Sequence, residues 1–262
     1  MLVFVHIPKT AGTTLHKVIS HQYRPKDILI RHDSDGPISE TLASWMGDPP
    51  KVVMGHYSVG LHQYVPGVRY ITCLREPVAR LISHYHYASG FPGHYLYDTI
   101  HRDKLDLAGY VSSGIAGELS NGMTRMLAGV QDCQASVGGE ALALAKRHIE
   151  EYFDVAILNE RFDEGLLLLG QQLGWATPYY FRRKVGHYSA AAANPDARTR
   201  QAILEFNALD VDLYEWAKER FDRQASVDPA LARRTQRFQS LNRHWGKAVF
   251  LARELRSRLN IS

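Results

Sequence analysis

The chain begins with an apolar run that passes directly into a loop rich in threonine, and this junction limits its possible folds more than any other feature. Residues 2–7 are mostly apolar and β-branched, as in a buried strand, and residues 8–14 follow with the sequence PKTAGTT. Leu15, Val18 and Ile19 then recur at helical spacing. The pattern predicts a strand, a tight loop and a helix. Because such a loop directs backbone N–H groups and the positive end of the helix dipole at one spot, we expect an anion to bind there.

Three further apolar runs predict strands, at residues 51–54, 69–74 and 153–158. A helical pattern starts at Pro77, directly after the second of these runs, and another covers the region around Glu164 to Leu173. Strands that alternate with helices form a mostly parallel sheet with helices on both faces. The sequence therefore predicts an α/β protein with a P-loop-like three-layer fold. Ligands of such sheets bind at the carboxyl ends of the strands, where the loop at residues 8–14 would lie.

The C-terminal part of the chain differs in charge from the rest. Apolar residues at helical spacing predict a helix over residues 197–221, after which Asp228-Pro229 interrupts the pattern. Residues 230–262 carry eight Lys/Arg and a single acidic residue, a net charge of +7, which leaves −3 of the total +4 for the rest. We expect one domain at 1–222 and a basic helical extension at 223–262. The extension is predicted to pack on the domain or to form a homodimer.

Composition places the chain among ordinary folded proteins. It has 45% hydrophobic and 22% charged residues over 262 positions. No apolar run approaches the roughly 20 residues that span a bilayer, and the first run is too short for a signal peptide. Cys73 and Cys133 form no closely spaced pair and no metal-ligand motif. These features predict a cytoplasmic protein that needs no metal and has no transmembrane segment.

The loop at residues 8–14 is not a Walker A motif. That motif places lysine directly after its second glycine, whereas Lys9 precedes Gly12 by three residues. Gly12 allows a close approach of the backbone, Thr13 and Thr14 supply hydroxyl donors, and Lys9 supplies a mobile positive charge. A lysine at the start of the loop can reach the atom that joins a phosphate to its leaving group.

A second loop carries a further set of anion-binding residues. Residues 75–83 read REPVARLIS, at the end of the strand predicted for residues 69–74. Arg75 and Ser83, two helical turns apart, can converge on one phosphate through a guanidinium fork and a hydroxyl. Arg80 lies between them and is predicted to be structural. Two separate phosphate grips in this order indicate a nucleotide with two distant phosphates.

The two loops resemble those of the sulfotransferase superfamily that uses 3'-phosphoadenosine-5'-phosphosulfate (PAPS). The sequence FVHIPKTAGTTL at residues 4–15 is similar to the 5'-phosphosulfate loop of the heparan-sulfate and uronyl 2-O-sulfotransferase branch and its bacterial relatives without a membrane anchor. The REPVARLIS segment matches that branch's 3'-phosphate motif. The resemblance covers most of residues 1–222.

The resemblance implies a role for each motif residue. Lys9, Thr10, Ala11, Gly12, Thr13 and Thr14 would hold the 5'-phosphosulfate, and Arg75 and Ser83 the 3'-phosphate. His56 follows Gly55 where relatives carry a catalytic base, and Lys9 would stabilise the leaving phosphate. The other histidines near the loops, including His84 and His94, are predicted to be surface or packing residues.

Two later segments also resemble this branch. Asn121 and Arg125 lie in a stretch where relatives contact acceptor or cofactor, with a structural role as the alternative. Arg182 and Lys184 lie where relatives close over the adenosine and the 3'-phosphate. The predicted reaction moves a sulfuryl group from PAPS to a hydroxyl of a carbohydrate or glycolipid and leaves adenosine 3',5'-bisphosphate (PAP).

Two other interpretations remain open from the sequence. A P-loop phosphotransferase would use Mg²⁺-ATP, but it would need a Walker lysine and a carboxylate for the metal ion. A non-enzymatic protein could bind nucleic acid, anionic lipid or an acidic glycan through the basic segment at 230–262. Because the basic pI belongs to this segment, general affinity for polyanions is not expected of the main domain, and nucleic acid is not an expected partner of the enzyme.

Overall fold

The fold is described by a computed structural model, which covers residues 1–31, 40, 49–130, 132, 135–181 and 194–258. Within these residues a sheet of five parallel strands has the order β2-β3-β1-β4-β5. The strands are β1 (Leu2–Val5), β2 (Ile28–Arg31), β3 (Val52–Gly55), β4 (Arg69–Leu74) and β5 (Phe153–Leu158). Val5 at the end of β1 pairs with Gly55 of β3 on one side and with Thr72 of β4 on the other. The loops after these three strands therefore share one edge of the sheet.

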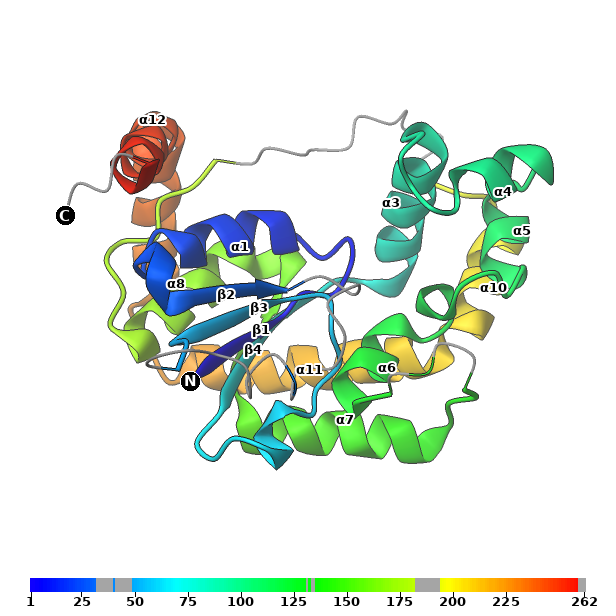
Figure 1. Cartoon of the computed structure of the whole chain (residues 1–262), viewed down its shortest axis with the longest axis horizontal. Coiled ribbons are helices and arrows are strands. Elements are labelled where there is room, and N and C mark those ends of the chain that lie inside the picture. Colours follow the sequence, from blue (N-terminus) through cyan, green and yellow to red (C-terminus); the bar gives the residue numbers. More distant parts are fainter. Residues whose placement is uncertain (32–39, 41–48, 131, 133–134, 182–193, 259–262) are drawn as a thin grey trace.

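Helices cover both faces of the sheet (Figure 1). In chain order, the described helices up to residue 128 are α1 (Gly12–Ser20), α3 (Pro77–Gly90), α4 (Tyr97–Arg102), α5 (Leu107–Ser112) and α6 (Gly122–Ala128). Those from residue 139 onward are α7 (Gly139–Tyr152), α8 (Phe162–Leu173), α10 (Ala197–Phe206), α11 (Ala208–Ser226) and α12 (Leu231–Arg258). Helices α1 and α8 lie on one face, and α7 and α11 lie on the other. Strands β1, β3, β4 and β5 are buried on both faces over most of their length, as their largely apolar sequences require, whereas the edge strand β2 is partly exposed.

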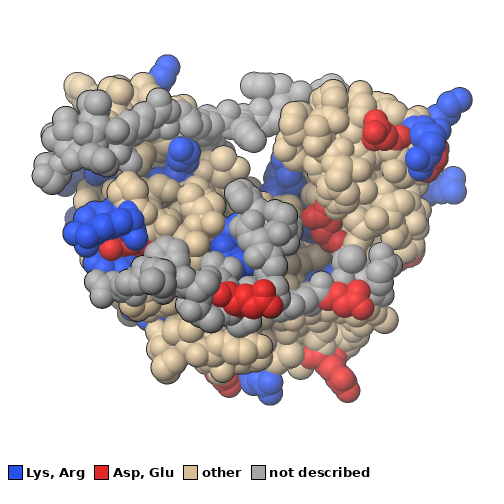
Figure 2. Space-filling view, in the orientation of Figure 1, with Lys and Arg blue, Asp and Glu red and all other residues tan. Residues whose placement is uncertain are grey.

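Four helices form a lobe beside the sheet. Helices α3, α4, α5 and α10 enclose a second apolar core, which contains Leu81, Ile100, Tyr110 and Ile203. Figure 1 shows this lobe on the side of the sheet where the loop after β1 lies. The molecular surface is hollowed between the lobe and the sheet body, and both basic and acidic side chains face the hollow (Figure 2). The loops at the strand ends are thus placed between two separately packed units.

Helix α12 packs along α8 and presents a second face to solvent. Leu231, Phe238 and Phe250 are buried on the inner face. Leu241, Trp245 and Leu255 are exposed, and Trp245 has 62% of its surface accessible. No described helix has the length and apolar character needed to cross a membrane. The division at residue 222 and the homodimer through this helix stay predictions.

The predicted fold class, an α/β protein with a parallel sheet and a basic C-terminal helix, is confirmed. One helix prediction is wrong, because residues 197–221 form two helices that meet at Asn207. Asn207 is fully buried, and its Nδ2 donates to the carbonyls of Leu119 and Ile203. Its Oδ1 accepts from the backbone N–H of Asn121. These bonds anchor the junction between the two helices. The short edge strand β2 was not predicted.

Candidate active site

The loop between β1 and α1 has the backbone conformation of an anion cradle. Lys9 and Ala11 have positive φ angles of 69° and 66°, whereas Thr10 between them does not. When left-handed and right-handed backbone conformations alternate in this way, successive N–H groups point into one concavity. Thr10 is buried, and its hydroxyl donates to the carbonyl of Ile7 at 2.9 Å, which fixes the loop from beneath. Helix α1 has no acidic residue in its first turn to compete for an anion.

Gly12 is required because the ring of His6 lies directly against it. A Cβ atom at position 12 would lie 1.9 Å from Cδ2 of His6, so any side chain there would displace the ring or the loop. Of the loop hydroxyls, Thr13 is exposed and Thr14 is half-buried. Thr13 and Thr14 thus lie at the start of α1, where their hydroxyls can reach an anion bound by the loop.

His56 lies directly beside this loop, at the end of β3. Its ring stacks on that of His6, with 4.1 Å between the ring centroids. Burial, together with the charges of His56, His16 and Lys9, lowers the pKa of His6 to about 3. His6 is therefore neutral at physiological pH. The Nδ1 atom of His56 is buried and makes no hydrogen bond to the residues that the structure describes.

Arg75 joins the loop after β4 to the loop after β1. Its Nη1 donates to the carbonyl of Lys9 at 3.2 Å, and its buried Nε has no hydrogen-bond partner among the described residues. Glu76 caps α3 by accepting hydrogen bonds from the N–H groups of Val78 and Ala79, which fixes the start of this helix next to Arg75. Ser83 follows two turns into α3 and is half-buried. A buried guanidinium N–H without a partner, beside a cradle of N–H groups, suits an anionic ligand.

Arg80 has the structural role that the sequence predicts. It is completely buried, and its Nη2 lies 3.0 Å from the carbonyl of Glu118 and 3.4 Å from Oδ2 of Asp210, which is also buried. Desolvation lowers the pKa of Arg80, and the charges of Asp210 and Glu118 oppose this shift. The same Asp210 accepts from the N–H groups of Met123 and Thr124 at the start of α6. The pair therefore joins α3, α6 and α11 behind the site.

The side chains of Asn121 and Arg125 make hydrogen bonds to the backbone. Oδ1 of Asn121 accepts from the N–H groups of Leu209 and Asp210 at the start of α11. The Arg125 guanidinium donates to the carbonyls of Ser120 and Ala135. These contacts favour the structural alternative for both residues. Arg182 and Lys184 lie outside the described residues.

Lys9 extends from the loop toward the helical lobe. Its Nζ lies 4.2 Å from the centre of the Tyr87 ring, a cation–π contact with α3. His94 lies next to Tyr87, with 5.4 Å between ring centroids, and the Lys9 charge contributes to a lowered pKa of His94, after burial and His84. The spacing of Tyr87 and His94 in the sequence gives no sign of this arrangement, which depends on the packing of the lobe.

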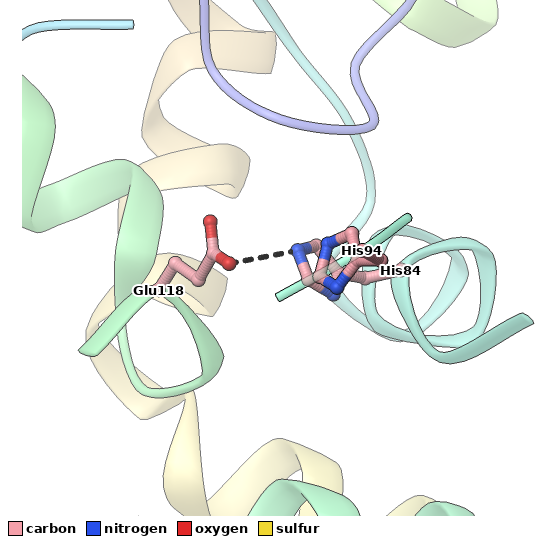
Figure 3. A group of neighbouring side chains, drawn as sticks. All are labelled: His84, His94 and Glu118. Carbon is pink, nitrogen blue, oxygen red and sulfur yellow. Dashed lines mark ion pairs between the residues drawn. The ribbon is translucent and has the colours of Figure 1, made fainter. Parts of the chain in front are cut away.

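His84, His94 and Glu118 form a cluster in this lobe (Figure 3). Their nearest ligand-type atoms all lie within 4.8 Å of one another, and His84 Nε2 is 3.1 Å from Glu118 Oε1. By residue type the set could hold a divalent metal. However, Nδ1 of His94 accepts from the N–H of Leu96 at 3.2 Å, which places the proton of the neutral ring on Nε2. A metal ion on Nε2 of His94 would have to replace the ring proton, and one on Nδ1 would have to displace the N–H of Leu96. Hydrogen bonding therefore suits the cluster better than metal ligation does.

Comparisons with known proteins identify a sulfotransferase family. A family model described as galactose-3-O-sulfotransferase matches residues 49–249, a range that includes His56, Arg75 and Ser83. The chain is also 27% identical to galactose-3-O-sulfotransferase 3 of Bos taurus over 261 residues. That match covers 90% of this chain but only 60% of the relative. The predicted sulfotransferase family is confirmed, whereas the narrower 2-O-sulfotransferase branch stays unsupported by these matches. The chain belongs to the galactose-3-O-sulfotransferase family.

Proposed function

We propose that the protein transfers a sulfuryl group from PAPS to a hydroxyl of a galactose-containing carbohydrate. One observation carries the proposal: Arg75 reaches across from the loop after β4 to bind the backbone of Lys9 in the loop after β1. This contact brings the two loops together and supports a single site formed by both predicted phosphate-binding motifs. Family membership supports the reaction class, and the name of the bovine relative supports the sugar.

The donor PAPS suits the residues of this site. The cradle of residues 9–14 would hold the 5'-phosphosulfate, with the N–H groups at the start of α1 facing its negative charge. The orphaned Nε of Arg75, together with the Ser83 hydroxyl, would hold the 3'-phosphate. When bound, PAPS supplies an activated sulfuryl group on a good leaving group. A Walker lysine is missing, and no observation on this site favours a phosphotransferase.

The proposed base for the acceptor hydroxyl is His56, and its location beside the loop of residues 8–14 supports this role. In the proposed reaction the acceptor oxygen bonds to sulfur as the bond from sulfur to the 5'-phosphate oxygen breaks. The hydroxyl proton passes to His56, and the electron pair of the broken bond stays on the phosphate. Lys9 and the loop N–H groups stabilise the charge that grows there. His6 is neutral and packed against His56, so it positions this ring without competing for the site's protons.

The donor site is tested by the binding of PAP and of AMP, which lacks the 3'-phosphate. Wild-type protein is expected to bind PAP more tightly than AMP. Arg75→Ala should weaken the binding of PAP by about tenfold to a hundredfold, the range of one or two charge-assisted hydrogen bonds. The binding of AMP should change little. Isothermal titration calorimetry measures both constants.

The matched control is Arg69→Ala, which removes an exposed arginine from the opposite end of the same strand, where it pairs with Asp154. This variant should bind PAP like the wild type. Equal loss of PAP and AMP in Arg75→Ala would show that Arg75 acts through the loop and not on the 3'-phosphate.

A further inference from the structure

Four aromatic rings continue outward from the proposed transfer centre. Tyr87 stacks on Phe91 with 5.6 Å between centroids, and His94 lies edge-on to Tyr87 and stacks on Tyr95 at 4.8 Å. We call Tyr87, Phe91, His94 and Tyr95 the aromatic wall. Its outer rings are exposed, Tyr95 to 67% and Phe91 to 48%. Large aromatic side chains this exposed, side by side, are typical of a binding surface.

The inner end of the wall touches the transfer centre. Tyr87 lies 4.2 Å beneath Nζ of Lys9, the group that would stabilise the leaving phosphate. A molecule that stacks on the wall therefore extends toward the position of the sulfuryl group. An acceptor needs this geometry, because its hydroxyl must meet the sulfur atom while the rest of it is held elsewhere.

A carboxylate flanks the wall. Burial raises the pKa of Glu118, but hydrogen bonds from His84 and Tyr95 and the charge of Arg80 outweigh this and lower it to about 2. Glu118 is therefore ionised at neutral pH and acts only as a hydrogen-bond acceptor. Its Oε1 accepts from the Tyr95 hydroxyl at 2.6 Å and lies 3.1 Å from Nε2 of His84. About a quarter of its side chain stays accessible.

We propose that the aromatic wall is the surface on which the acceptor sugar binds, with Glu118 accepting a hydrogen bond from one of its hydroxyls. A sugar ring offers an apolar C–H face to the rings and hydroxyl donors to the carboxylate, so both parts of the surface are used. The inference rests on the proposed sulfuryl transfer and assigns the acceptor half of that site.

Kinetics with a galactoside test the wall. Tyr95→Ala and Phe91→Ala are each expected to raise the acceptor KM by about tenfold, since each removes one stacked ring. The calorimetric Kd for PAP should stay within about twofold of wild type. Tyr95→Phe keeps the ring and should retain most of the affinity for the acceptor. The matched control is Tyr64→Ala, which removes a tyrosine of 65% exposure outside the wall, after the short helix at Leu61–Gln63.

Saturation-transfer NMR with methyl β-galactoside and the PAP-bound protein gives a second measurement that needs no turnover. The sugar signals should be strong with wild type and Tyr64→Ala and weak with Tyr95→Ala and Phe91→Ala. Unchanged KM and unchanged sugar signals in both wall variants would overturn the proposal. Weaker binding of PAP together with an unchanged acceptor KM would also overturn it, because that result would assign the rings to adenine. Failure of the proposed function itself would appear differently, as wild-type protein that binds sugar but not PAP.

Discussion

Replacement of His56 by alanine is expected to lower kcat by about 10²-fold or more, the contribution of a well-placed general base. The ring lies at the end of β3, beside the cradle of residues 9–14, and no other histidine stacks on His6 among the described residues. Its removal leaves the acceptor hydroxyl without a proton acceptor, because His6, with a pKa of about 3, is a poor base. Initial rates with saturating PAPS and galactoside measure the effect.

Two controls separate catalysis from folding. His101→Ala removes an exposed histidine on α4 whose Nε2 bonds to the carbonyl of Ser89 and whose ring contacts Tyr97, and the kcat of this variant should match the wild type. The Kd of His56→Ala for PAP should change little, because the residues of the donor site remain in place. A kcat for His56→Ala within a few-fold of wild type would remove this residue from the role of base.

Asp210→Ala is expected to lower the free energy of unfolding by about 3–5 kcal/mol, the range for removing one partner of a buried ion pair. The Arg80 guanidinium is fully buried and would lose its ion-pair partner, with only the more distant charge of Glu118 left to balance it. The N–H groups of Met123 and Thr124 would also lose their acceptor at the start of α6. Urea denaturation followed by circular dichroism measures the loss.

The same helix provides the control for this experiment. Glu215 pairs with Lys218 on the solvent face of α11, where 59% of the glutamate side chain is accessible. Glu215→Ala should change stability by less than about 0.5 kcal/mol. If Asp210→Ala proves too unstable to purify, Asp210→Asn keeps an oxygen for Thr124 and should still unfold at a lower urea concentration than Glu215→Ala. Equal midpoints for the two helix positions would contradict a stabilising role of the buried pair.

The sequence predicted those parts of the fold that local patterns determine. The strands β1, β3, β4 and β5 are mostly apolar runs, and a sheet buried on both faces requires such runs. Strand β2 contains only three consecutive apolar residues, Ile28 to Ile30, and lies at the sheet edge, and an apolar run this short does not by itself distinguish a strand from other structure. The helix break at Asn207 depends on partners 86 and 88 residues away, which no local pattern reveals.

The candidate site, like the fold, was predicted from the sequence only in part. Lys9 and Gly12 belong to one short sequence motif and Arg75 and Ser83 to another, each after a predicted parallel strand, so the sequence predicted that both lie at one edge of the sheet. The contact between Arg75 and Lys9 supports this prediction. The aromatic wall combines the end of α3 with the turn after it, and Glu118 reaches it from a separate turn. Glycine and proline in that turn indicate only a loop. Its proximity to Lys9 follows from how the lobe packs beside the sheet.

Transfer of a sulfuryl group that carries an isotope label on its sulfur atom, from PAPS to a sugar, tests the central claim most directly. The wild-type protein is incubated with labelled PAPS and, in parallel, with methyl β-galactoside, methyl β-glucuronide and heparan sulfate. We expect label on the galactoside, a product heavier by one SO₃ group, and loss of that product in His56→Ala. Tight binding of PAP without transfer to any of these carbohydrates would contradict the claim that the site sulfates a sugar.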